Sequence, residues 1–226
     1  MTTGDSGEPI PATGREGGET ANARDTNRLE AFSDGVFAIA ITLLIIEIRP
    51  PHIEVGQGSP ELLRALLDLW PAYLGYVISF LTIGTMWINH HHIFGFIART
   101  DPGLVAINTV FLLCVAFIPF PTALMTEYLG DPGQQVATLV FGGWFTVTAI
   151  AYNLLWWYPS RDRRLIEPNA PQKTLDTITH RYRLGPPIYI VSTLLALFSP
   201  ILSVAIYLVL AIVYLIPYRG GAPEPA

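Results

Sequence analysis

The sequence predicts an all-α integral membrane protein with six transmembrane helices per subunit. Of its 226 residues, 51% are hydrophobic and 14% are charged, whereas soluble domains carry about a quarter charged residues. The apolar residues also form long runs separated by short polar segments, which is the pattern of helices that cross a bilayer. Finally, almost all of the basic residues lie in segments that would be on the same side of the membrane.

The first apolar run is predicted to form a span over residues 32–48. It ends where Arg49, Pro50 and Pro51 prevent further helix. The preceding residues 1–27 are rich in glycine, threonine and glutamate and contain no aromatic residue. We therefore expect a disordered N-terminal tail there, without the apolar core of a signal peptide.

The second span is predicted over residues 71–94. It follows a polar segment and the sequence Ser59-Pro60-Glu61, which reads as a helix start with proline at the first helical position. Several leucines come next, and Trp70 indicates the membrane interface. The span ends in three histidines, 90–92.

The third and fourth spans are predicted over residues 104–125 and 135–158. Pro119 and Pro121 predict a kink or an early end of the third span. The fourth ends in Trp156-Trp157-Tyr158, an aromatic cluster typical of the membrane interface.

A basic loop, 161–183, leads into a last apolar stretch, 184–217. As one helix this stretch would be about 50 Å long, well over a bilayer. Ser199-Pro200 offers a break near its middle. We therefore predict two short spans, although hydropathy alone also permits one, and a transmembrane domain over 28–219 with a short C-terminal tail, 220–226.

The distribution of basic residues supports this topology. With six spans and both termini in the cytoplasm, 11 of the 13 Lys and Arg residues lie inside. Only Arg49 and Arg64 lie outside, which satisfies the positive-inside rule. No basic stripe with interleaved aromatic residues occurs, so a nucleic-acid partner is not indicated.

One narrow face of the first span carries Gly35, Ile39, Thr42, Ile46 and Arg49, at spacings of four, three, four and three. Small and branched residues at this period are typical of a helix–helix packing stripe. In a symmetric assembly the same face would form rings, in which apolar side chains gate by dewetting and hydroxyls replace the water of an ion. The periodicity alone leaves both interpretations open.

The start of this span resembles the signature of the transmembrane protein 175 family. Arg28-x-x-x-Phe32-Ser33-Asp34, followed by the apolar run through Thr42-Leu43-Leu44, carries the resemblance. Two further stretches are similar to the family: Trp87-x-x-His90 with the adjoining His91, and Phe117-Ile118-Pro119-Phe120-Pro121-Thr122. The resemblance covers roughly residues 28–217.

The resemblance implies a potassium channel whose first helix lines a central pore. Members with one six-helix repeat form homotetramers, and this chain holds the Phe-Ser-Asp element once. The family has no glycine-rich carbonyl filter, and no TVGYG-like sequence occurs here. The family's apolar constriction falls on Ile39, with Leu43 and Ile46 as further pore-lining positions, and its hydroxyl layer falls on Thr42.

The resemblance also implies a polar network below the pore helix. Its members here would be Arg28, Ser33, Asp34, Trp87 and His90. The alternative is that Arg28 and His90 lie among lipid headgroups.

Other residues near this element are weaker site candidates. They are Gly35, Glu47 at the outer mouth, and His91. Adjacent histidines on a helix point in different directions, so we expect no metal site within one subunit. Glu47 would attract cations or pair with Arg49.

We therefore predict passive, potassium-selective conduction in a bacterial-type plasma membrane, with no cofactor. The expected partners are further copies of the chain, membrane lipid and potassium ions. A secondary transporter is the alternative, although Pro119 and Pro121 are the only broken-helix candidates and no matching repeat follows. Proton leak through the same pore is another. An enzyme is not expected, because no nucleophile accompanies Asp34 and the histidines in sequence.

Overall fold

The computed structural model describes residues 13–52, 54 and 58–215, and the regular elements in these ranges are helices. In chain order they are α1 (Thr13–Leu43), the 3₁₀ segment η1 (Leu44–Glu47), α2 (Ser59–Asp68), α3 (Trp70–Phe94), α4 (Pro102–Phe117), α5 (Pro119–Tyr128), α6 (Gln134–Ser160), the 3₁₀ segment η2 (Arg161–Arg163), α7 (Gln172–Arg183), α8 (Gly185–Leu195) and α9 (Pro200–Leu215). The all-α prediction is thus confirmed.

Four segments of the described chain are long and apolar enough to cross a membrane. They are Arg24–Glu47, Trp70–Phe94, Pro102–Tyr128 and Gln134–Arg163. They match the four long spans predicted from the sequence. A count of six depends on the shorter α8 and α9, which contain 11 and 16 residues.

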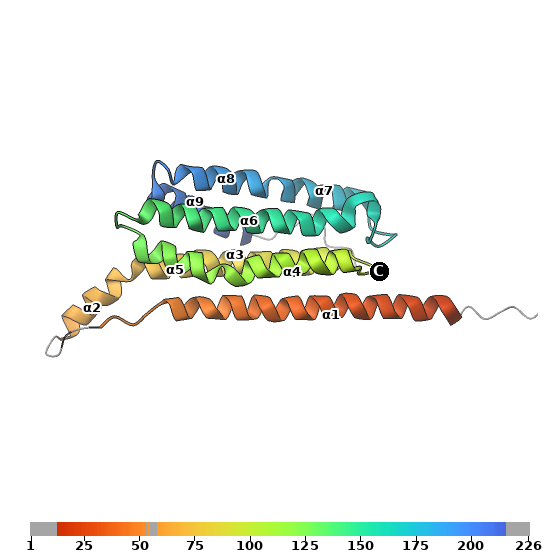
Figure 1. Cartoon of the computed structure of the whole chain (residues 1–226), viewed down its shortest axis with the longest axis horizontal. Coiled ribbons are helices and arrows are strands. Elements are labelled where there is room, and N and C mark those ends of the chain that lie inside the picture. The colour runs from red at the N-terminus through yellow and green to blue at the C-terminus, as the bar shows by residue number, and fades with distance from the viewer. Residues whose placement is uncertain (1–12, 53, 55–57, 216–226) are drawn as a thin grey trace, which may run out of the picture.

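The helices pack side by side as an elongated bundle with α1 along one edge (Figure 1). α1 contacts α3 and α4, and α4 and α5 in turn contact α6. On the far side α8 packs on α6 and α9, while α9 also contacts α3. At its N-terminal end α1 runs on past the rest of the bundle (Figure 1). α1 is therefore the peripheral helix of the subunit.

Proline and serine account for the breaks inside the apolar runs. α4 ends at Phe117, and α5 starts at Pro119, as the two prolines of this run predict. The last apolar stretch is two helices, because α9 begins at Pro200 and the Ser199 hydroxyl accepts a hydrogen bond from the Leu202 N–H at 3.3 Å. The break predicted at Ser199-Pro200 is confirmed.

Two expectations about the polar segments need correction. Residues 1–12 of the expected disordered tail lie outside the described residues, but 13–27 are part of the helix α1. The basic loop contains the helix α7, whose Leu175, Ile178 and Tyr182 are buried at helical spacing. The many charged residues of this segment indicated a loop rather than a helix with an apolar face.

The first span is also less regular than predicted. The α-helix ends at Leu43 and tightens into η1 (Leu44–Glu47), after which Ile48 is extended. A 3₁₀ turn advances about 120° per residue and an α-helix about 100°. Ile46 and Arg49 are therefore rotated away from the line through Ile39 and Thr42.

The two loops at the N-terminal end of α4 and the C-terminal end of α6 are joined. Backbone hydrogen bonds run from Ala98 N to Leu165 O and from Glu167 N to Phe96 O, each at 2.9 Å. Arg99 donates to the Arg164 carbonyl at 2.9 Å. These contacts gather the basic loops at one end of the bundle, as the predicted topology requires.

Asp101 links three elements at this end. Its Oδ1 accepts the Leu104 N–H at 2.8 Å and so caps α4, while Oδ2 accepts from the Tyr158 hydroxyl at 2.9 Å and from Arg164 at 3.0 Å. Partial burial acts to raise the pKa of Asp101. The hydrogen bonds from Leu104 and Tyr158 and the Arg164 charge outweigh it and hold that pKa below its ordinary value of 3.8.

We predict that Asp101→Ala destabilises the subunit by about 1–2 kcal/mol, because α4 loses its cap. Since the folded-state pKa is lowered, the contribution of Asp101 is complete above pH 3.8 and is lost as the pH falls through the lowered value. Thermal unfolding in detergent at pH 7 and at pH 3 measures both effects. A difference between wild type and Asp101→Ala that does not shrink at pH 3 would contradict this role.

Candidate functional site

Helix α1 has one buried face and one bare face. Ser33, Phe37, Ala40 and Leu44 are at most 1% exposed and pack into the bundle. On the other side Ile39 is 61% exposed and Ile46 is 67% exposed. Within a single subunit the predicted pore-lining residues are therefore not a packing stripe.

The remaining pore-lining candidates share the bare face. Leu43 is 41% exposed, and Gly35 and Thr42 are exposed as well. A Cβ atom on Gly35 would meet no atom within 4 Å, so this glycine is not required for packing inside the subunit. All of these side chains are available to a neighbouring molecule or to lipid.

The Thr42 hydroxyl is held against its own helix. It lies 2.9 Å from both the Ala38 and the Ile39 carbonyl oxygens, to which it donates its proton. Its oxygen lone pairs therefore remain for an acceptor role on the bare face. A cation is the type of partner that such an oxygen can bind.

Ser33, Asn108 and His90 form a hydrogen-bonded chain between α1, α4 and α3. Ser33 donates to the Leu29 carbonyl at 2.8 Å and accepts from Asn108 Nδ2 at 2.9 Å. Asn108 Oδ1 lies 2.9 Å from His90 Nε2. Because an amide oxygen only accepts, Nε2 carries the proton. All three side chains are fully buried.

Aromatic rings enclose the His90 imidazole. It stacks on Phe94 with centroids 4.2 Å apart and meets Phe37 edge-on at 5.4 Å. Its Nδ1 is buried and has no hydrogen-bond partner among the described residues. The ring therefore fills the junction of three helices and holds it in one arrangement.

A second, more exposed pair of contacts joins α1 to α3. Trp87 Nε1 donates to Asp34 Oδ1 at 2.8 Å, and His91 Nδ1 lies 2.6 Å from Glu30 Oε1. Arg28 is exposed and belongs to neither set among the residues that the structure describes. The network expected as one unit is thus split in two, and its Arg28 member is not part of it within one subunit.

Two members of these contacts were missed in the sequence. Asn108 is a lone amide in the apolar run of α4, and Glu30 lies one helical turn before Ser33. An isolated amide at membrane depth is a signal for a buried hydrogen bond.

The three histidines do not form a metal site. His90 faces Asn108, His91 faces Glu30, and His92 meets Phe96 edge-on. In the described part of the chain, no three His, Cys, Asp or Glu residues could hold an ion together.

Glu47 lies at the other end of α1. It is half-buried and, with Arg49, Asp68 and Glu127, lines an open cavity of about 580 Å³ between η1, α3 and α5. The charged side chains in this wall are three acids and one arginine, so the wall is acidic on balance.

These features define a multi-pass α-helical membrane protein whose first helix is fixed by a buried polar chain on one face and bare on the other. The family model described as endosomal/lysosomal potassium channel TMEM175 matches residues 28–119. A potassium channel of Chamaesiphon minutus is 45% identical over 196 residues, which is 87% of this chain and 96% of that one. The chain belongs to the TMEM175 family, a family of ion channels rather than enzymes.

Two further relatives and one solved structure are also similar to this chain. A potassium channel of Streptomyces collinus is 41% identical over 84% of this chain and 91% of that protein. The crystal structure described as a lysosomal potassium-selective channel TMEM175 homolog from Chamaesiphon minutus has a TM-score of 0.77 and covers 84% of this chain and 96% of that one, at 45% identity. A chicken relative named endosomal/lysosomal proton channel TMEM175 is 32% identical over 63% of this chain, which is 30% of that protein.

We predict that Asn108→Leu destabilises the subunit by about 1–3 kcal/mol, because it leaves His90 Nε2 buried without a partner and removes the donor to Ser33, which keeps only its bond to the Leu29 carbonyl. Thermal unfolding in detergent measures the loss. Thr109→Val is the matched control, since the neighbouring Thr109 is exposed and bonds only its own helix at Val105. Equal stability of the two variants would show that the buried chain does not hold α1.

Proposed function

We propose that this chain is a potassium-selective cation channel in which four copies place their α1 helices around a central pore. The bare face of α1 carries the proposal. Ile39, Thr42 and Leu43 are exposed in the subunit, while the opposite face of the same helix is locked into the bundle. The names of the bacterial relatives as potassium channels support the conducted ion.

The pore would combine an apolar ring with a hydroxyl ring. Four Ile39 side chains would form a constriction that a hydrated ion does not pass without losing water, and four Thr42 oxygens one turn away would replace part of that water. Leu43 would extend the apolar lining outward, followed by Ile46, which is exposed but displaced by the 3₁₀ turn from the line through Ile39 and Thr42. Gly35 would leave the pore wide on the other side of Ile39, because it adds no side chain.

The remaining features fit this arrangement. α8 and α9 would be the fifth and sixth spans, and the end with the basic loops would face the cytoplasm of a plasma membrane under the positive-inside rule. Glu47 would then raise the cation concentration at the outer mouth. Arg28, exposed at the inner end of α1, would contact a neighbouring subunit or a headgroup.

A proton-conducting pore of the same architecture is the second candidate. The observation that favours it is the name of the vertebrate relatives, which are called proton channels. The same apolar constriction would exclude hydrated ions yet pass protons along transient water chains. The two candidate functions therefore differ in which ion, potassium or the proton, crosses the membrane.

Reconstituted protein tests the conducted ion. We expect potassium efflux from proteoliposomes well above that of empty liposomes, and Ile39→Asn should increase the flux and reduce the preference for potassium over sodium, because the apolar barrier becomes polar. Leu113→Asn is the control, since Leu113 is 62% exposed on α4 rather than α1. Proton flux without potassium flux would favour the second candidate, and neither flux from a confirmed tetramer would exclude both.

Cross-linking tests the position of α1. The single cysteine, Cys114, is buried and can be replaced by serine. In that background Ile39→Cys should form dimers under oxidation or with a short bifunctional thiol reagent, because neighbouring α1 helices approach closely at the constriction. Leu113→Cys should stay monomeric on denaturing gels. Cross-linking of Leu113→Cys instead would place α4, not α1, at the axis.

A further inference from the structure

A cavity lies on the side of the bundle away from α1. It has a volume of about 80 Å³, is half open, and has Thr85, Met86, Ala149, Arg181, Gly185 and Ala211 among its lining residues. These residues come from α3, α6, α7, α8 and α9, so the cavity sits where the two halves of the bundle meet. Nothing in the conduction pathway uses it.

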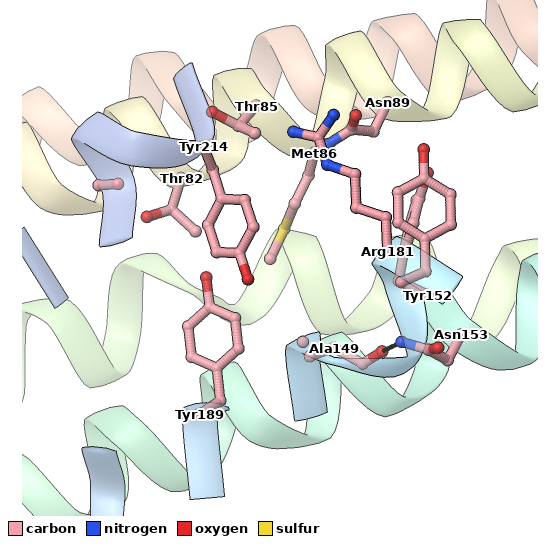
Figure 2. Close-up of a pocket in the computed structure, with 13 residues that line it drawn as sticks. Thr82, Thr85, Met86, Asn89, Ala149, Tyr152, Asn153, Arg181, Tyr189 and Tyr214 are labelled. Carbon is pink, nitrogen blue, oxygen red and sulfur yellow. Dashed lines mark hydrogen bonds between the residues drawn. The ribbon is translucent and has the colours of Figure 1, made fainter. Parts of the chain in front are cut away.

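The wall of the cavity is apolar and aromatic, with one cation. Figure 2 shows the Arg181 side chain extending from α7 toward α3, where Met86 and Asn89 lie, and the Tyr189 and Tyr214 hydroxyls facing each other across the space. Among the described residues that line it there is no acidic side chain. A positive group beside apolar walls favours an anionic head joined to an apolar body.

Thr85 adds a polar group that points to a ligand. It is 8% exposed, and its hydroxyl has no hydrogen-bond partner among the described residues. Thr82, one turn earlier on the same helix, bonds the Ile78 carbonyl at 2.7 Å, which is the usual arrangement for threonine in a helix. Burial of an unsatisfied hydroxyl is costly, and a ligand oxygen would satisfy it.

The position of Arg181 indicates that the anion is a phospholipid headgroup. α7 is the basic amphipathic helix, and the apolar helix α8 begins at Gly185, one turn beyond Arg181. Arg181 therefore lies at the boundary between the basic end and the membrane-embedded part of the bundle. This is the level at which phospholipid headgroups meet their acyl chains.

We propose that this cavity is a binding site for an anionic phospholipid, whose phosphate pairs with Arg181 and whose first chain segment enters between Met86, Ala149 and Ala211. The cavity is too small for a whole lipid, and its open side leaves the rest of the molecule in the bilayer. Thr85 donates to an oxygen of the glycerol or ester region. The bound lipid joins α3 to α7 and α8.

Native mass spectrometry of delipidated protein titrated with phosphatidylglycerol in detergent tests the site. We expect binding that is about tenfold weaker for Arg181→Gln, which loses a charge-assisted hydrogen bond. Arg183→Gln is the matched control, because Arg183 is exposed and does not line the cavity. Equal binding by wild type and Arg181→Gln would overturn the proposal.

Two further arms do not depend on the folding of the arginine variant. Gly185→Leu should block binding, because a Cβ at Gly185 meets no atom within 4 Å and the larger side chain then occupies the cavity. On the wild-type protein, phosphatidylcholine should bind about tenfold more weakly than phosphatidylglycerol. Inorganic phosphate at the same concentration should neither bind nor compete. Binding of phosphate alone, or equal binding of the two lipids, would overturn the lipid assignment.

Discussion

The hydrogen-bonded chain from Ser33 through Asn108 to His90 is the constraint on which the arrangement of the subunit depends. It joins α1, α4 and α3 with side chains that are fully buried. Polar groups buried away from water are costly unless they are hydrogen-bonded, so the Ser33–Asn108 and Asn108–His90 bonds favour one specific geometry. The rotation of α1 about its own axis is thereby fixed, and with it the direction of every other side chain on that helix.

The fixed rotation explains why two faces of one apolar helix have different roles. Phe37, Ala40 and Leu44 follow Ser33 at helical spacing and are buried in the bundle. Ala38, Ile39 and Leu43, which lie between them, are also apolar but are exposed in the subunit. Hydrophobicity does not distinguish the two sets, since lipid is as apolar as a protein core. The polar residues at the start of the helix decide which set is turned inward.

Much of the fold was predictable from the sequence, because apolar length and proline are strong signals in a membrane protein. The four long spans, the break at Pro119 and the split at Pro200 follow from them. The 3₁₀ ending of α1 did not, because no residue of Leu44–Glu47 opposes an α-helix and tertiary contacts decide the last turn. The helix α7 was missed because its basic residues suggested a loop.

The candidate site was likewise predictable only in part. Ser33, Asp34, Trp87 and His90 were predicted from the sequence as polar contacts, and the structure gives each a partner. Within one subunit their hydrogen bonds form two sets rather than one, because this division depends on distances across helices that spacing along the chain does not encode. Asn108 joins the buried members. It could have been predicted from the sequence only by noting that an amide inside an apolar run requires a hydrogen-bond partner.

The short helices α8 and α9 have a consequence for the lipid around the protein. At 1.5 Å per residue they are about 17 and 24 Å long, against a hydrocarbon layer of about 30 Å. Where such helices meet the bilayer, the membrane thins or the flanking residues stretch to reach the interface. In the proposed assembly these helices lie at the outer rim, farthest from the axis. Bilayer thickness then acts on the subunit at its rim, through hydrophobic mismatch.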